Sequence, residues 1–176
     1  MQRHQLEHII RAAAGITGTP EFVIVGSQAI LGQFPQAPED LLVSIEADVF
    51  SLRSSADSDL IDGSIGEGSP FHQTFGYYAH GVGADTAVLP DGWKGRLVPV
   101  RNENTGGGTG LCLEVHDLAV SKLVAGREKD MAFLASLLRH GLARMEPIRE
   151  RLAATALDAT RRELCHARLQ RLAAQR

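Results

Sequence analysis

The spacing of apolar residues changes twice within the first 50 positions of the chain. Over residues 3–15 they recur every three or four positions, which predicts an amphipathic helix that ends near Gly15. Residues 21–26 are apolar without alternation, as in a strand buried on both faces, and a short helix is expected to begin at Ser27. Over residues 41–50 the period becomes two, which predicts a strand with two different faces.

The strand predicted over residues 41–50 carries two carboxylates on one face. Glu46 and Asp48 are two positions apart and therefore project on the same side, about 6–7 Å apart at the usual strand rise. The opposite face of this strand is entirely apolar. A solvated outer face of a half-exposed sheet would give the same alternation, so the pattern alone does not assign the carboxylates a role.

The rest of the chain predicts a few more strands and then only helices. Residues 51–76 are rich in Ser, Gly and Asp and are interpreted as one or two short helices in a loop-like insertion. Strands are predicted over 77–89, 97–100 (at a sheet edge, because of Pro99) and 111–115, and helices over 117–125, 129–140, 145–156 and 158–174. The fold class is therefore α+β, or mixed α/β. We expect a mixed sheet flanked by helices in residues 1–116, and a C-terminal helical bundle or tail, residues 117–176, that packs on it.

Composition narrows the classes of protein that fit this pattern. A chain of 176 residues allows one compact domain with a helical extension, and 44% hydrophobic residues suffice for a buried core. Aromatic residues make up only 5%, which argues against a surface built to stack bases or sugars. No apolar run reaches the length of a membrane span and no leader pattern opens the chain, so we expect a cytoplasmic protein without a membrane partner. Cys112 and Cys165 are expected to be reduced thiols.

Charge is distributed unevenly although the net charge is only −3. From Lys122 onward, 12 Lys and Arg stand against 6 Asp and Glu, whereas the preceding residues hold 6 against 15. A basic C-terminal third on an acidic body suits an anionic ligand such as a nucleotide or RNA. An exposed, arginine-rich helix face is the alternative explanation.

The turn at Gly26 and Ser27, taken together with the carboxylate strand, indicates chemistry on phosphates. A helix N-terminus offers unpaired backbone N–H groups, Gly26 lets a phosphate approach the backbone closely, and the Ser27 hydroxyl adds a donor. Glu46 and Asp48 could bridge a pair of Mg²⁺ (or Mn²⁺) ions about 3.5–4 Å apart, as in many phosphoryl-transfer sites. An ordinary helix cap would also account for Ser27, because Ser is among the favoured N-cap residues.

The order and spacing of these residues resemble those of a known family. Gly-Ser at 26–27, followed by Glu-Ala-Asp at 46–48, resembles the Gly-Ser … Asp-x-Asp signature of the DNA polymerase β-like nucleotidyltransferase superfamily. Residues 117–130 (Asp-Leu-Ala-Val-Ser-Lys-Leu-Val-Ala-Gly-Arg-Glu-Lys-Asp) resemble the Lys … Arg-x-Lys-Asp element of its AbiEii-like branch, which includes nucleotidyltransferase toxins of bacterial toxin–antitoxin systems. The resemblance covers roughly residues 5–140.

The resemblance implies a role for each matching residue. The metal ligands and catalytic carboxylates would be Glu46 and Asp48, with Asp130 as a further catalytic or organising carboxylate. The phosphate-binding residues would be Gly26, Ser27, Lys122, Arg127 and Lys129. On a helix that continues through Gly126, Lys122 and Lys129 would share a face and could meet one anion.

Two departures from the family pattern bear on activity. Glu46 stands where the family usually has Asp, which lengthens the ligand arm by one methylene. The third strand carboxylate of the family is left open between Asp85 and Asp130.

The segment 69–80 is dense in histidine and aromatic residues. Its two histidines lack a third ligand at zinc spacing, so it does not predict a zinc site. We interpret the segment as a lid or base-binding wall, with packing of its rings in the core as the alternative. The wall would consist of Phe71, His72 and Tyr78.

The sequence as a whole predicts a Mg²⁺-dependent nucleotidyltransferase. It would move a nucleoside monophosphate from a triphosphate to a hydroxyl on RNA, protein or a small molecule, as a toxin-type enzyme with a cognate antitoxin. A catalytically inactive relative that keeps the fold for binding is the alternative. Homo-oligomerisation through the C-terminal helices is a further expectation, which rests on their leucines, Leu152, Leu157, Leu164, Leu169 and Leu172.

Overall fold

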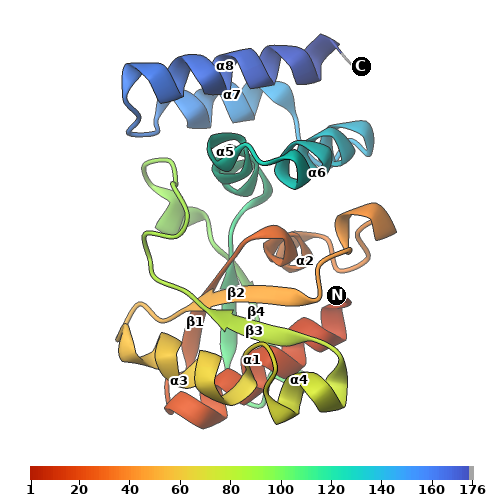
Figure 1. Ribbon diagram of the computed structural model, residues 1–176, viewed down its shortest axis with the longest axis vertical. Helices are drawn as coiled ribbons and strands as arrows, with labels where there is room; N and C mark the ends of the chain where they lie inside the picture. Colours follow the sequence, from red (N-terminus) through yellow and green to blue (C-terminus); the bar gives the residue numbers. More distant parts are fainter. Residues whose placement is uncertain (175–176) are drawn as a thin grey trace.

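The computed structural model describes residues 1–174, which form a five-stranded mixed sheet with helices on both faces (Figure 1). The strand order is β3-β2-β1-β5-β4, in which β1 pairs antiparallel with β2 and parallel with β5. The strands are β1 (Glu21–Val25), β2 (Glu46–Phe50), β3 (Tyr78–Gly81), β4 (Val98–Val100) and β5 (Thr109–Cys112). The predicted mixed α/β class is confirmed.

Two layers of helices enclose this sheet. One face is covered by α1 (Arg3–Thr17), α3 (Ala56–Ile65) and α4 (Pro70–Phe75), and the other by α2 (Ile30–Gln33) (Figure 1). Beyond α2 lies the C-terminal helical region: α5 (Val115–Ala125), α6 (Glu128–Arg139), α7 (Met145–Ala153) and α8 (Ala159–Ala174). Short 3-10 helices complete the chain: η1 (Ser27–Ala29), η2 (Glu39–Leu41), η3 (Trp93–Arg96) and η4 (Glu103–Thr105). Within residues 1–174, none of these helices combines the length and apolarity that a membrane span requires.

Strand β1 lies at the centre of the sheet because its sequence can be buried on both faces. Residues 22–25 (Phe-Val-Ile-Val) are at most 1% exposed, as the apolar run without alternation predicted. The prediction that Pro99 marks an edge strand is also confirmed, since β4 is the last strand of the order. The first helix is longer than predicted: it passes through Gly15 and ends at Thr17, and Gly18 caps it with a φ of 68°.

The strand predicted over residues 41–50 forms only in its second half. Val43 and Ile45 are 79% and 48% exposed, so the apolar face expected there is not buried. Pairing with β1 covers Asp48 to Phe50, because β1 ends one residue before the turn at Gly26. The strand predicted over 77–89 is likewise short and ends at Gly81, after its pairing with β2.

The helices α5 and α6 are separated at Gly126, which adopts a left-handed conformation with φ of 62°. The expectation that Lys122 and Lys129 share one helix face is therefore wrong. Arg168 of α8 closes the end of α5, since its Nη1 donates to the carbonyls of Leu123 and Val124 at 2.8 and 3.1 Å. Its guanidinium lies against Gly126, where a Cβ atom would overlap it.

We expect Gly126→Ala to destabilise the protein by about 1–3 kcal/mol, because alanine is strained at positive φ and would displace Arg168. Gly15→Ala is the matched control: Gly15 lies within α1 with open space around it, so alanine should stabilise the helix by roughly 0.5–1 kcal/mol. Denaturant unfolding of both variants measures the difference. Equal effects of the two substitutions would contradict the role given to the Gly126 turn.

Candidate functional site

The pairing of β1 with β2 brings the Gly26 turn against the carboxylate strand. Val25 and Asp48 are partners in the register, and Gly26 follows with φ of 68° and ψ of −173°. A Cβ atom on residue 26 would overlap Oδ2 of Asp48. Only glycine therefore allows both this backbone conformation and this close approach of the carboxylate.

The residues after the turn form η1, which Ser27 opens. Ser27 is half-buried and follows Gly26, which is the N-cap residue of η1. The next residue, Gln28, is only 1% exposed, and neither its amide nitrogen nor its amide oxygen has a partner among the described residues. Buried unpaired amides are rare and costly, which marks Gln28 as unusual beside the turn. The sequence around Gln28, a short polar stretch before an apolar run, did not predict that its amide would be buried and unpaired.

Asp48 is poorly solvated and close to another negative charge. Burial of the carboxyl, followed by the charge of Glu46, raises the pKa of Asp48. The parallel pairing of β3 with β2 places His80 opposite Asp48, with 3.3 Å between Nδ1 and Oδ1. The same pairing places Tyr78 opposite Glu46, and the Tyr78 hydroxyl donates to Oε2 of Glu46 at 2.9 Å.

Two cations at the α5–α6 turn are held by one buried acid. Asp130 is fully buried and accepts from Nζ of Lys122 at 3.0 Å and from Nε of Arg127 at 2.6 Å. Although burial opposes ionisation, the hydrogen bonds from Arg127 and Lys122 lower the pKa of Asp130. Asp130 thus lies behind the two cations and pairs with both of them. Lys122 is itself buried, and its ammonium lies 5.5 Å from the centre of the Phe133 ring.

A cavity of about 130 Å³ joins these elements. Gly26 and Asp48 line it from the sheet, and Lys122 and Arg127 line it from the helical region. The side chain of Arg127 is 60% exposed, and its guanidinium has N–H donors besides the two that contact Asp130. The loop after β3 supplies a third wall, residues 86–88, which the sequence did not predict because nothing in Thr-Ala-Val signals a site.

Other predicted site residues lie outside the lining of this cavity. Lys129 is exposed at the start of α6, and Asp85 is exposed in the loop after β3, next to the cavity wall. Ser27 directly follows the lining residue Gly26, and Glu46 lies on β2 two positions before the lining residue Asp48, but neither of them lines the cavity itself. The predicted base-binding wall is divided: the rings of His72 and Tyr78 are 4.6 Å apart, whereas Phe71 packs with a different cluster.

The donor set fits a metal ion that arrives with its substrate. No group of three or more His, Cys, Asp or Glu side chains within residues 1–174 is arranged to hold a metal ion. Two carboxylates on one strand remain, and Mg²⁺ is usually held by one or two carboxylates together with substrate phosphates and waters. The raised pKa of Asp48 is also consistent with a bound metal ion, because a nearby cation would relieve the repulsion between Asp48 and Glu46.

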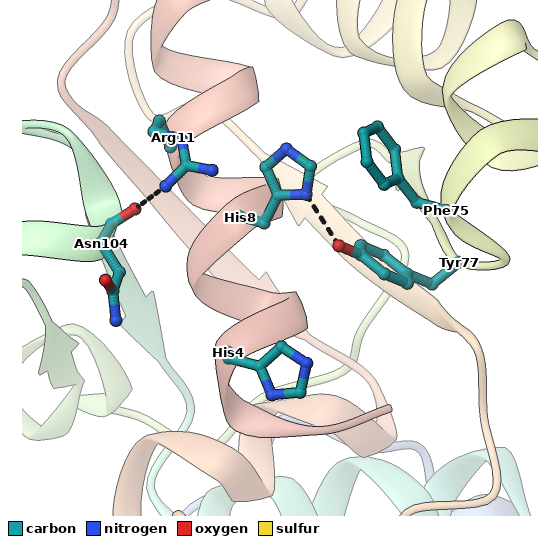
Figure 2. Close-up of a pocket in the computed structure, with 6 residues that line it drawn as sticks. All are labelled: His4, His8, Arg11, Phe75, Tyr77 and Asn104. Atoms are coloured by element: carbon teal, nitrogen blue, oxygen red, sulfur yellow. Dashed lines mark hydrogen bonds between the residues drawn. The ribbon is translucent and has the colours of Figure 1, made fainter.

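A larger hollow, of about 490 Å³, lies elsewhere on the molecule, along α1 (Figure 2). Its lining consists of His4, His8, Arg11, Phe75, Tyr77 and Asn104. His8 Nδ1 and the Tyr77 hydroxyl are 2.7 Å apart, and Nη1 of Arg11 donates to the backbone carbonyl of Asn104 at 2.6 Å (Figure 2). None of the predicted site residues lines this hollow, so size alone does not identify the functional site.

Comparison with known proteins gives one family. The family model described as nucleotidyltransferase of unknown function (DUF6036) matches residues 4–167. No curated protein and no solved structure was found to match the chain. The matched range includes both the sheet and the helical region, and therefore both sides of the cavity.

We expect Asp48→Asn to stabilise the metal-free protein in a pH-dependent way. Because folding raises the pKa of Asp48, ionisation of this carboxyl destabilises the folded state. The destabilisation is absent below the ordinary pKa of about 3.9, where the group is protonated in both the folded and the unfolded state. The destabilisation of the folded protein grows as the pH rises towards the raised pKa of Asp48, and it persists above that pKa. Asn carries no charge, so the melting temperature should rise by roughly 2–4 °C at pH 7.5 and by less at pH 4.5.

Scanning calorimetry at the two pH values measures this gain, with Asp85→Asn as the control. Asp85 is an exposed loop carboxylate, and its replacement should leave the melting temperature nearly unchanged. A gain for Asp48→Asn that is equally large at both pH values would show that charge is not its cause.

Proposed function

The chain belongs to this nucleotidyltransferase family, and from that premise we propose that it is a Mg²⁺-dependent enzyme that transfers a nucleoside monophosphate from a triphosphate to a hydroxyl group. The acceptor hydroxyl would belong to RNA, protein or a small molecule. The resemblance to the AbiEii-like branch supports a toxin-type enzyme with a cognate antitoxin as its partner.

One observation carries this proposal: a single cavity is lined by the Gly26 turn, the carboxylate of Asp48 and the cations Lys122 and Arg127. Transfer from a nucleoside triphosphate needs mainly positioning and charge neutralisation, and little covalent chemistry from the protein. These four residues provide a close approach to the backbone, a metal-ligating oxygen and two positive charges. Asp48 and Lys122 are 74 positions apart in the sequence, so chance clustering of charge along the sequence does not account for their meeting.

The cations are suited to hold the phosphates. Arg127 presents a planar guanidinium, which can donate two parallel hydrogen bonds to one phosphate group. Lys122 is held by Asp130 and lies deeper, where its charge is less screened by solvent. Because Asp130 fixes both side chains in the free protein, little conformational entropy is lost when the phosphates bind.

Glu46 and Asp48 are the residues that would hold Mg²⁺. When bound, the metal ion would polarise the phosphate oxygens and neutralise the charge that develops on pyrophosphate. Asp48 would reach the ion from the cavity wall, and Glu46 from the neighbouring position on the same strand face.

A second candidate function is a nucleotide-binding module without turnover. The observation that favours it concerns the two candidates for a third carboxylate: Asp85 is exposed outside the lining of the cavity, and Asp130 is bound by two cations. Nucleotide binding is common to both functions, so the test has to measure transfer.

The test is single-turnover transfer from each labelled triphosphate with Mg²⁺ and total RNA, protein extract or small-molecule acceptors. We expect Asp48→Asn to abolish transfer, because several kcal/mol of stabilisation are lost with the metal arrangement and each ~1.4 kcal/mol is tenfold in rate. Glu46→Asp should keep measurable activity, since it restores the ligand that the family usually has. Full activity of Asp48→Asn would overturn the proposal, and folded protein that binds triphosphate without any transfer would favour the binding module.

A binding prediction separates the cavity from general basicity. Arg127→Ala should weaken triphosphate binding about tenfold, since hydrogen bonds to charged groups contribute roughly 1.5–3 kcal/mol. Lys129→Ala removes a cation only two residues away that does not line the cavity, and should change the affinity less than about twofold. Isothermal titration calorimetry of the two variants measures this, and equal losses would mean that only the net charge of the helical region matters.

A further inference from the structure

Tyr78 is placed directly beside Glu46 by the pairing of the two strands. The two residues are partners in the parallel register of β2 and β3, and the Tyr78 hydroxyl donates to Oε2 of Glu46 at 2.9 Å. The other carboxylate oxygen of Glu46, Oε1, has no hydrogen-bond partner among the described residues. One oxygen of the carboxylate is thus fixed by the protein and the other is left available.

The ring of Tyr78 is itself held in place. It is buried, and the ring of His72 lies 4.6 Å from it. Nδ1 of His72 accepts from the backbone N–H of Gly68 at 3.0 Å, and Ser69 caps the helix α4 that carries His72. The hydroxyl therefore points at Glu46 from a ring that has little freedom to rotate.

Glutamate needs such support more than aspartate would. Its side chain has one more rotatable bond, so an unsupported half-exposed Glu46 would sample several positions of the carboxylate. Mg²⁺ tolerates little deviation from octahedral geometry, and the position of each ligand therefore matters. A hydrogen bond from a fixed donor removes this freedom before the metal ion arrives.

We propose that Tyr78 is a positioning residue that holds the longer arm of Glu46 so that its free oxygen can ligate the metal ion. The inference rests on the proposed function and deepens it: Tyr78 and Glu46 act as one unit in place of a shorter carboxylate. An aspartate at position 46 would be too short to reach the hydroxyl and would not depend on it.

The chain offers a matched control in the preceding residue. Tyr77 is also buried and its hydroxyl is also paired, but with His8 beside the hollow along α1. Tyr77→Phe and Tyr78→Phe each remove one buried, hydrogen-bonded hydroxyl from the same part of the chain. Any general loss of stability should therefore be similar for the two, while an effect on metal binding should be confined to Tyr78→Phe.

The experiment is a calorimetric titration of the full chain with Mn²⁺–tripolyphosphate, a probe that needs no choice of base. We expect Tyr78→Phe to weaken binding about tenfold, with a melting temperature close to that of Tyr77→Phe, since hydrogen bonds to charged groups are the stronger class. Tyr77→Phe should change binding less than about twofold. In the Glu46→Asp background, Tyr78→Phe should have no further effect, because the positioned arm is gone.

The outcomes separate this inference from the function on which it rests. A parent protein that does not bind the probe, or an Asp48→Asn variant that binds it equally well, would overturn both. Binding by the parent with an unchanged affinity in Tyr78→Phe would overturn the role of Tyr78 alone. The same follows if Tyr78→Phe loses affinity equally in the Glu46 and Glu46→Asp backgrounds, since Tyr78 would then not act through Glu46.

Discussion

The site depends on a close approach between the Asp48 carboxylate and the backbone of Gly26, at the end of the central strand. Asp48 has little solvent around it and the charge of Glu46 nearby, and both raise its pKa. A folded chain tolerates such a position only where the backbone leaves room and where positive charge is within reach. Glycine provides the room, and Lys122 and Arg127 provide the charge from across the cavity.

The helical region takes part in the site, although it lies outside the sheet. Asp130 fixes the two cations, and the turn at Gly126 separates the helices that carry them. Arg168 of α8 closes that turn through the last carbonyls of α5. Hydrogen bonds therefore connect the last helix to the turn beside the cavity, and Arg168 shows that part of the basic C-terminal third has a structural role.

Strand β3 adds a row of polar side chains beside the carboxylates of β2. Tyr78 faces Glu46 and His80 faces Asp48, because the parallel register sets the two strands residue by residue. The hydroxyl of Tyr78 orients the Glu46 carboxylate and leaves its other oxygen for a ligand. On the other side of the turn, the buried amide of Gln28 has no hydrogen-bond partner among residues 1–174.

The sequence by itself determined the elements that local pattern controls. The apolar run before Gly26 predicted a central strand, the Glu46/Asp48 alternation predicted a shared face, and Pro99 predicted an edge, because burial and backbone chemistry act over a few residues. The motifs also indicated the nucleotidyltransferase family, which the match over residues 4–167 confirms.

Tertiary structure alone decided which residues meet. The alternation over 41–50 extended past the true start of β2, because only pairing with β1 and β3 fixes where a strand begins. The prediction that Lys122 and Lys129 share one helix face was wrong because Gly126 adopts a left-handed turn between them. Arg168, which lies 42 positions further along the chain, packs against that turn. The places of Asp130 behind the cations and of Tyr78 beside Glu46 follow from contacts between elements, and no local pattern carries that information.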